Sequence, residues 1–221
     1  MFRRSRGFNR SKLISEAARA HARGRLRKAA ALYGKVLAVE SGDLDLHRKA
    51  APLLARVGRL EQARKSFELV ARGFAQSDHH PQAIGVYREA LHYLPRRAEL
   101  WLGIAQSQAA RGHPSDAVEA LLEGRSKLRR RRDRPAAIRL LNAARTLDPT
   151  LVEPSFDLAS LLHRTGDRRQ AQRLLEELGR TLAPHYFRRV RWLQLNFRPT
   201  PAAFWRMVRV LLLGRSSVAG A

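Results

Sequence analysis

The sequence predicts an all-α protein whose helices stack into a superhelical solenoid. The main observation is a recurring step in which an alanine is followed, four residues later, by a large apolar residue. This step occurs at Ala29/Tyr33, Ala63/Phe67, Ala83/Tyr87, Ala117/Leu121, Ala137/Leu141 and Ala171/Leu175, so the alanines lie 34, 20, 34, 20 and 34 residues apart. The alternation of apolar and polar residues that is typical of strands is absent throughout. A fixed period of this length indicates a solenoid, in which each unit buries its apolar face only against its neighbours.

The two spacings combine into a supra-repeat of 54 residues. At this offset the sequence pairs Ala51 with Ala105, Gly58 with Gly112, Ala63 with Ala117, Pro81 with Pro135, Ala83 with Ala137, Ala90 with Ala144 and Pro95 with Pro149. A 20-residue step is too short for two helices and their turns. One helix of each supra-repeat must therefore serve in two pairs, and residues 60–76 carry both patterns.

The expected elements follow in chain order. Helices are predicted from 11 to about 24 and from about 29 to 37, and then at 44–57, 60–76, 81–94, 97–111, 114–131, 135–147, 151–165 and 168–181. Four glycines fall at turns between helices, where positive φ is cheap only for glycine: Gly24, Gly58, Gly112 and Gly166. The helical array thus spans 11–182. A basic arm at 1–10 precedes it, and a basic and aromatic connector at 183–200, an amphipathic helix at 201–214 and a disordered tail at 215–221 follow it.

The 34-residue steps resemble the tetratricopeptide repeat, whose pattern is Trp-x2-Leu-Gly-x2-Tyr, then Ala-x3-Phe, then Pro. The fullest copy opens with Trp101, Ile104 and Ala105 and continues through Gly112 to Ala117-x3-Leu121; Pro95 and Pro149 close other copies. The resemblance covers about residues 11 to 180 and is to bacterial multi-repeat scaffolds of this family. It implies a non-catalytic protein-protein interaction scaffold with a superhelical groove. The shared helix departs from the family pattern.

Basic residues dominate the charge, with 43 Lys and Arg against 19 Asp and Glu and a formal net charge of +24. Only six of the basic residues are lysines, so 37 are arginines, which bind phosphate and carboxylate in a bidentate manner. Such a field favours an acidic protein, an anionic membrane surface or nucleic acid as partner. The alternative is an arginine-biased composition on solvated helix faces. Arg48 is expected to line the groove.

The densest basic run has a single carboxylate, Asp133, among its residues. It consists of Arg125, Lys127, Arg129, Arg130, Arg131, Arg132 and Arg134. Two interpretations stay open: cations stabilised at the C-terminus of a helix by its dipole, or a binding patch for an anion or an acidic partner. Aromatic residues for base stacking are missing nearby. Nucleic acid is therefore less favoured than an acidic protein.

The last predicted helix carries a wide apolar arc, with arginines on the opposite side. The arc is formed by Phe204, Trp205, Val208, Leu211 and Leu212. One interpretation is a helix that caps the last face of the array, since solenoids need such caps. The other is docking on a partner or on an anionic membrane, because Trp and Phe beside Arg are typical of interfacial helices.

Catalytic, metal and cofactor chemistry is not expected. The chain has no cysteine, and Asp78, His79 and His80 would need ligands from elsewhere to hold a metal. No small-molecule substrate is expected either. No apolar run approaches the roughly 18 residues of a membrane span, and the N-terminus lacks the apolar core of a secretory signal. A cytoplasmic location is predicted, with the membrane periphery as an alternative.

The leading hypothesis is a scaffold that binds acidic or peptide-like partners through the superhelix. The alternative is a basic peripheral binder of an anionic membrane surface or of nucleic acid, which would use Arg129 to Arg132 and the C-terminal tail. An enzyme is the disfavoured third possibility. Binding that is lost steeply as salt rises would favour phosphate contacts, whereas a peptide held in a groove should persist.

Overall fold

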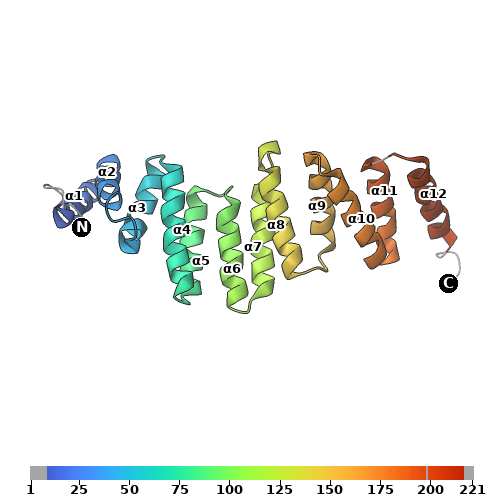
Figure 1. The fold of residues 1–221 in the computed structure, drawn as a ribbon, viewed down its shortest axis with the longest axis horizontal. Coiled ribbons are helices and arrows are strands. Elements are labelled where there is room, and N and C mark those ends of the chain that lie inside the picture. The colour runs from blue at the N-terminus through green and yellow to red at the C-terminus, as the bar shows by residue number, and fades with distance from the viewer. Residues whose placement is uncertain (1–8, 198, 217–221) are drawn as a thin grey trace, which may run out of the picture. The chain divides into compact units, whose positions relative to one another are not determined.

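The computed structural model describes residues 9–197 and 199–216, and within those residues it contains helices and turns but no strand. The chain divides into two compact units, Met1–Lys127 and Leu128–Ala221, and Figure 1 shows the helices of each. The first unit contains α1 (Arg10–Ala22), α2 (Leu26–Leu37), α3 (Leu44–Arg56), α4 (Leu60–Gln76), α5 (His80–Tyr93), α6 (Ala98–Ala110) and α7 (Pro114–Lys127). The second contains the 3-10 turns η1 (Arg131–Asp133) and η2 (Pro184–Tyr186) and the helices α8 (Arg134–Leu147), α9 (Val152–Thr165), α10 (Arg168–Thr181), α11 (Phe187–Phe197) and α12 (Pro201–Ser216). The predicted all-α class is confirmed.

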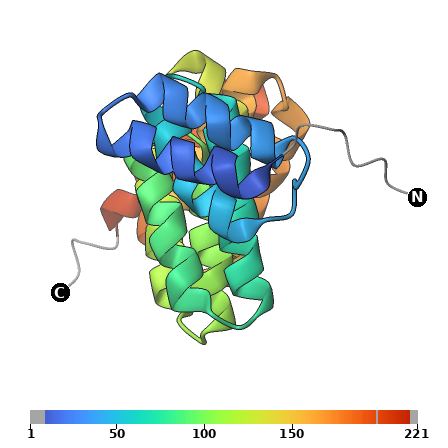
Figure 2. The ribbon, with the colours of Figure 1, turned by 90° about the vertical axis from the view of Figure 1, so that its left-hand side faces the viewer.

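Within the first unit, each helix packs against the next one along the chain, as solenoid helices do. Figure 2 shows α1 and α2, in dark blue, side by side. Helix α4 packs against both α3 and α5. Its Ala63 and Phe67 are buried, and the small residue lets a neighbouring backbone approach while the large one fills the space beside it. The shared helix predicted from the 20-residue step is therefore present.

The second unit shows the same sequential packing from α8 to α12. The helix starts repeat along the sequence at the predicted interval of 54 residues. Helices α3, α6 and α9 begin at Leu44, Ala98 and Val152, and α4, α7 and α10 begin at Leu60, Pro114 and Arg168. Helices α5 and α8 begin at His80 and Arg134, and α11 begins at Phe187, one residue before the next 54-residue step. In sequence, the helices thus form three successive sets of three, which are α3 to α5, α6 to α8 and α9 to α11.

The turns between paired helices have positive φ, as the four glycines predicted. Gly24, Gly58, Gly112 and Gly166 have φ of 70°, 83°, 79° and 97°. Asp78 takes the same left-handed conformation between α4 and α5, with φ of 59°, which Asp tolerates better than most side chains. These turns reverse the chain so that consecutive helices lie antiparallel.

Helix α7 is shorter than the sequence indicated, ending at Lys127 instead of near residue 131. Leu128 is buried although it lies outside the helix. Beyond it, the backbone N–H of Arg130 donates to the Asp133 carboxylate at 3.1 Å, in a separate 3-10 turn. The arginine run offers no apolar stripe that would bury a further helical turn, so the chain leaves the helix there.

The segment expected to be a connector, 183–200, contains η2 and helix α11, and α11 packs on α10 and α12. At the other end, Arg10 belongs to α1 and forms ion pairs with Glu40 at 2.6 Å and Asp43 at 2.5 Å. The rest of the predicted basic arm, except Asn9, lies outside the described residues. The same is true of 217–221 in the predicted disordered tail, whereas residues 215 and 216 complete α12.

Asp43 is expected to stabilise the first unit in a pH-dependent way. It caps α3, since its Oδ1 accepts from the Leu46 backbone N–H at 2.9 Å. This bond, together with the Arg10 guanidinium, lowers the pKa of Asp43. The Asp43→Ala variant should lose about 1–2 kcal/mol of unfolding free energy at neutral pH, measured by urea unfolding.

The Asp43→Asn variant is the matched control, because asparagine keeps the cap but cannot form the ion pair. A carboxylate whose pKa is lowered by folding contributes stability above its unfolded pKa of about 3.9, and that contribution is lost as pH falls through the folded value. The advantage of the natural protein over Asp43→Asn should therefore vanish in strong acid. An advantage that does not change with pH would contradict this role.

Candidate functional site

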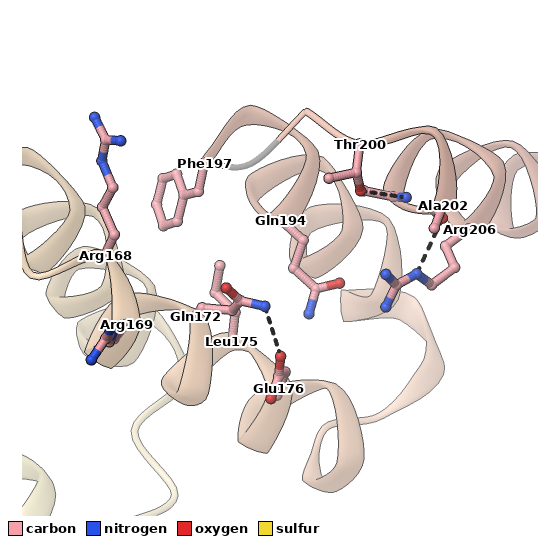
Figure 3. A pocket seen from close by; sticks show the side chains of 11 residues that line it. Arg168, Arg169, Gln172, Leu175, Glu176, Gln194, Phe197, Thr200, Ala202 and Arg206 are labelled. Atoms are coloured by element: carbon pink, nitrogen blue, oxygen red, sulfur yellow. Dashed lines mark hydrogen bonds between the residues drawn. The ribbon is translucent and has the colours of Figure 1, made fainter.

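A cavity of about 540 Å³ lies between α10, α11 and α12 in the second unit. Figure 3 shows side chains from all three helices around it. Its lining combines cationic, amide and apolar groups. The lining residues are Arg168, Arg169, Gln172, Leu175, Glu176, Gln194, Phe197, Thr200, Ala202, Ala203 and Arg206.

The sequence of α10 explains one wall of the cavity. Its apolar residues Ala171, Leu174, Leu175 and Leu178 are buried in one stripe. The first turn, in which Arg168, Arg169 and Gln172 stand, remains exposed beside that stripe. Leu175 alone belongs to both sets, because it is fully buried in the core and also forms part of the cavity floor.

The opposite wall depends on how α12 begins. The Thr200 side chain caps α12 by accepting from the Ala203 backbone N–H at 3.2 Å, and Pro201 occupies the first helical position, where its missing N–H costs nothing. This start places the small residues Ala202 and Ala203 at the cavity and Arg206 one turn later, as Figure 3 shows. Small side chains at this point leave the space open.

A third wall comes from α11 and is held in place by ring stacking. Phe197 stacks on His163 of α9 with ring centroids 4.1 Å apart and an interplanar angle of 3°. Gln194 accepts a hydrogen bond from Arg191 at 2.8 Å, so its amide nitrogen still has its donor capacity. The wall therefore offers an aromatic ring and an amide donor to a ligand.

Positive charge dominates the rim of the cavity. The single lining carboxylate, Glu176, accepts from Gln172 at 3.0 Å, and Arg206 donates through Nε to the Ala202 carbonyl at 3.1 Å. Within residues 9–197 and 199–216, Arg168 and Arg169 have no ion-pair partner. Guanidinium groups in this state are good ligands for carboxylate. The arrangement can hold an anionic group at the rim and an apolar group on the floor.

The first unit has recesses of a different character. One of about 690 Å³ includes Asp116, Glu119 and Glu123 beside Arg88 and Lys127, so its charges are mixed. Another, at the turn after α1, is lined by Gly24, Arg25, Leu26, Arg27, Lys28, Arg56 and Val57. It is basic but has no aromatic or amide side chain. Neither recess combines a cationic rim with an apolar floor and an aromatic wall.

The basic residues predicted as sites lie elsewhere and remain predictions. Arg48 lines a small recess of the first unit beside Asp43 and Asp45. Arg125 and Lys127 stand in the last turn of α7, with Lys127 3.9 Å from Glu123. In the second unit, the side chains that follow Leu128 are largely exposed; these are Arg129, Arg130, Arg131 and Arg132. Arg134 donates to the Arg164 carbonyl at 3.2 Å.

The predicted docking residues of α12 do not line the cavity. Phe204, Trp205, Leu211 and Leu212 are exposed, and Val208 is half-buried. The cavity residues Arg168, Arg169, Gln194 and Arg206 were not singled out from the sequence. The 54-residue offset would have pointed to them, because it places a helix after residue 187 that brings Gln194 opposite α10.

Among the described residues there is no group of three or more His, Asp or Glu side chains that could hold a metal ion. In the same part of the chain, no helix combines the length and the hydropathy needed to cross a bilayer.

The pairing of helices around positive-φ glycines at a 34-residue step is the geometry that the repeat pattern predicted. In the first unit Trp101 of the fullest copy is buried, and its Nε1 donates to the Pro95 carbonyl at 3.0 Å. This bond ties the tryptophan of one copy to the proline that closes the copy before it. The fold is tetratricopeptide-like.

No protein-family model matches the sequence, and a search of curated proteins also gave no match. A tetratricopeptide repeat protein from Parabacteroides merdae is similar to 93% of this chain over 92% of its own, at 14% identity and a TM-score of 0.31. A tetratricopeptide protein of Thermus thermophilus is similar to 91% of this chain over 98% of its own, at 16% identity and a TM-score of 0.27. The tetratricopeptide-like repeats of a kinesin light chain from Podosopora anserina are similar to 86% of this chain over 97% of their own, at 18% identity and a TM-score of 0.29. These scores are too low to carry an argument, so the tetratricopeptide-like fold rests on this chain's own helix pairs.

Proposed function

We propose that this chain is a cytoplasmic, non-catalytic interaction scaffold that holds acidic, peptide-like segments of partner proteins. The observation that carries the proposal is the cavity between α10, α11 and α12. It places Arg168, Arg169 and Arg206 around an apolar floor, and its single carboxylate is already hydrogen-bonded to Gln172.

A peptide with acidic and apolar side chains fits these groups. An Asp or Glu side chain would pair with the guanidinium of Arg168 or Arg169, in the bidentate geometry that carboxylates prefer. A neighbouring apolar side chain would lie on Leu175 and against the Phe197 ring. A volume of this size is within the range of binding pockets and fits a small group of side chains. The Gln194 amide would bind a peptide carbonyl.

The charge of the whole chain supports the same partner class. A net charge of +24 attracts acidic segments and raises their association rate at low salt. Affinity would then come from the apolar contacts and from the partly desolvated charge pairs in the cavity. Steering therefore depends on the whole surface, whereas residence depends on the few cavity side chains.

The proposal is tested by titrating a fluorescent peptide of alternating Glu and Leu and measuring its anisotropy. The Arg168→Gln/Arg169→Gln variant should weaken binding by about tenfold or more, since two charge-assisted contacts are lost. Arg130→Gln/Arg131→Gln is the matched control, because it removes the same charge from exposed residues of the same unit. The control should change affinity by less than about threefold.

Equal losses in the two variants would mean that bulk charge binds the peptide, and the cavity assignment would fail. The same would follow if a peptide with Gln in place of Glu bound as tightly. Raising the salt concentration should slow association, but a substantial part of the affinity should persist.

A further inference from the structure

Helix α12 has two apolar faces, of which only one is covered. Ala203 is buried, and Met207 and Val210 are half-buried on the side that packs against α11. The second face consists of Phe204, Trp205, Val208, Leu211 and Leu212, and spans about a third of the helix circumference. Phe204 is 52% exposed, Trp205 68% and Leu212 65%. Large apolar side chains with this exposure are unusual unless they bind something.

The position of α12 in the repeat explains why this face is bare. Helices α3, α6 and α9 each open a set of three helices, and each is covered by the helix that follows it. Helix α12 comes after α11, where the next such set would open. Among the described residues no helix follows it. The face that the other opening helices bury is therefore exposed on α12.

The side chains of this face are not those that receive a helix elsewhere in the chain. The covered opening helices α3, α6 and α9 include buried alanines, Ala51, Ala105 and Ala159 among them, and such small residues let a neighbouring helix approach closely. The exposed arc of α12 contains only large side chains. It is also rich in aromatic groups, since Phe204 and Trp205 contact each other with ring centroids 6.1 Å apart. Trp192 of the adjacent helix α11 is 55% exposed as well.

The charge around the face restricts what can cover it. After Glu177 the sequence contains eight arginines and neither Asp nor Glu. Of these, Arg206 and Arg209 are exposed on α12 beside the apolar arc. A second copy of the chain would bring the same uncompensated positive charge against this region, which disfavours a symmetric dimer. An anionic surface is complementary to it.

We propose that the exposed face of α12 is a docking site for an anionic lipid bilayer. The helix would lie in the plane of the interface, with Phe204, Trp205 and Leu212 among the acyl chains and with Arg206 and Arg209 at the phosphate groups. Exposed Trp and Phe beside arginines are the composition that binds at this depth. The helix is too short to anchor the protein alone, and the positive charge of the chain adds attraction to the anionic leaflet.

The site is tested with the full chain and two kinds of vesicle, phosphatidylcholine alone and phosphatidylcholine with about a third phosphatidylglycerol. Flotation should show binding to the anionic vesicles only. Emission from the exposed tryptophans should shift to the blue as they enter the bilayer. The Phe204→Ser/Trp205→Ser/Leu212→Ser variant should bind at least about tenfold more weakly.

The matched control removes three exposed apolar side chains of the first unit. It is Val39→Ser/Leu60→Ser/Leu69→Ser, in residues that are 63%, 41% and 38% exposed, and it should bind like the natural protein. Should the triple α12 variant fail to fold, Trp205→Ser alone should still weaken binding by about threefold or more. Circular dichroism reports the fold of each variant.

Three results would overturn the proposal. The first is no binding to anionic vesicles, and the second is equal binding by the α12 variant and the natural protein, which would leave charge alone as the cause. The third is a dimer in sedimentation that the α12 variant abolishes, because a second copy would then cover the face. The peptide titration separates this proposal from the scaffold function, since the α12 variant should keep its affinity for the acidic peptide.

Discussion

Replacing Phe67 by alanine is expected to lower the free energy of unfolding by about 3–5 kcal/mol, the largest single effect in the chain. Phe67 is 2% exposed and stands in α4, the helix that packs against both α3 and α5. Its ring also stacks on Tyr93 of α5, with centroids 6.2 Å apart. The substitution would therefore open a cavity between helices that are shared by two pairs, where local collapse cannot fill it.

Urea unfolding followed by circular dichroism measures this loss. Leu69→Ala is the matched control, because Leu69 is in the same helix but is 38% exposed. It should cost less than about 1 kcal/mol, since little apolar area is buried there. Similar losses for the two variants would contradict the role of Phe67 as the centre of a shared helix.

Replacing Gly124 by alanine is expected to destabilise the first unit by about 1–3 kcal/mol, although alanine is the better helix former. A Cβ at this position would lie 2.5 Å from Cγ, 2.8 Å from Cδ2 and 2.9 Å from Cβ of Trp101. These atoms are near the Trp101 backbone and cannot swing aside. The ring itself is buried and its Nε1 is bonded to the Pro95 carbonyl. Either α6 or α7 must move.

Gly85→Ala supplies the opposite expectation for the same chemical change. Gly85 is exposed on α5, and no heavy atom lies within 4 Å of its added Cβ. Helix propensity then acts alone, and the variant should gain up to about 1 kcal/mol. Unfolding midpoints that shift in opposite directions would support the close packing of Trp101 on Gly124. Stabilisation in both variants would show that α7 can yield.

The repeated helix pairs were predictable because their signals are local. The alanine steps and the glycines at the turns lie within a few residues of the structures they specify, and Gly24 and Gly166 have positive φ as expected. Helix α11 was missed because its motif has changed. At the 54-residue offset, Arg191 replaces the alanine and Leu195 the large apolar residue. Only the period, continued past residue 181, could have indicated it.

The cavity could not be predicted for the same reason. Arg168 and Arg169 are the charged first turn of an amphipathic helix, as many helices have. They become part of a site because α11 and α12 bring Phe197 and Arg206 to the same space. The arginine run after residue 124 is far denser in sequence. Its members nevertheless divide between the last turn of α7 and the segment that opens the second unit.

Hydrogen-deuterium exchange of the full chain, with and without the Glu and Leu peptide, tests the central proposal most directly. A peptide held in the cavity should slow exchange at the start of α10, at the end of α11 and in the first turns of α12, where the lining residues lie. It should leave residues 129–134 unchanged. Slowed exchange confined to that arginine segment, or no slowing in α10 to α12 under saturating peptide, would contradict the account and move recognition to the exposed basic surface.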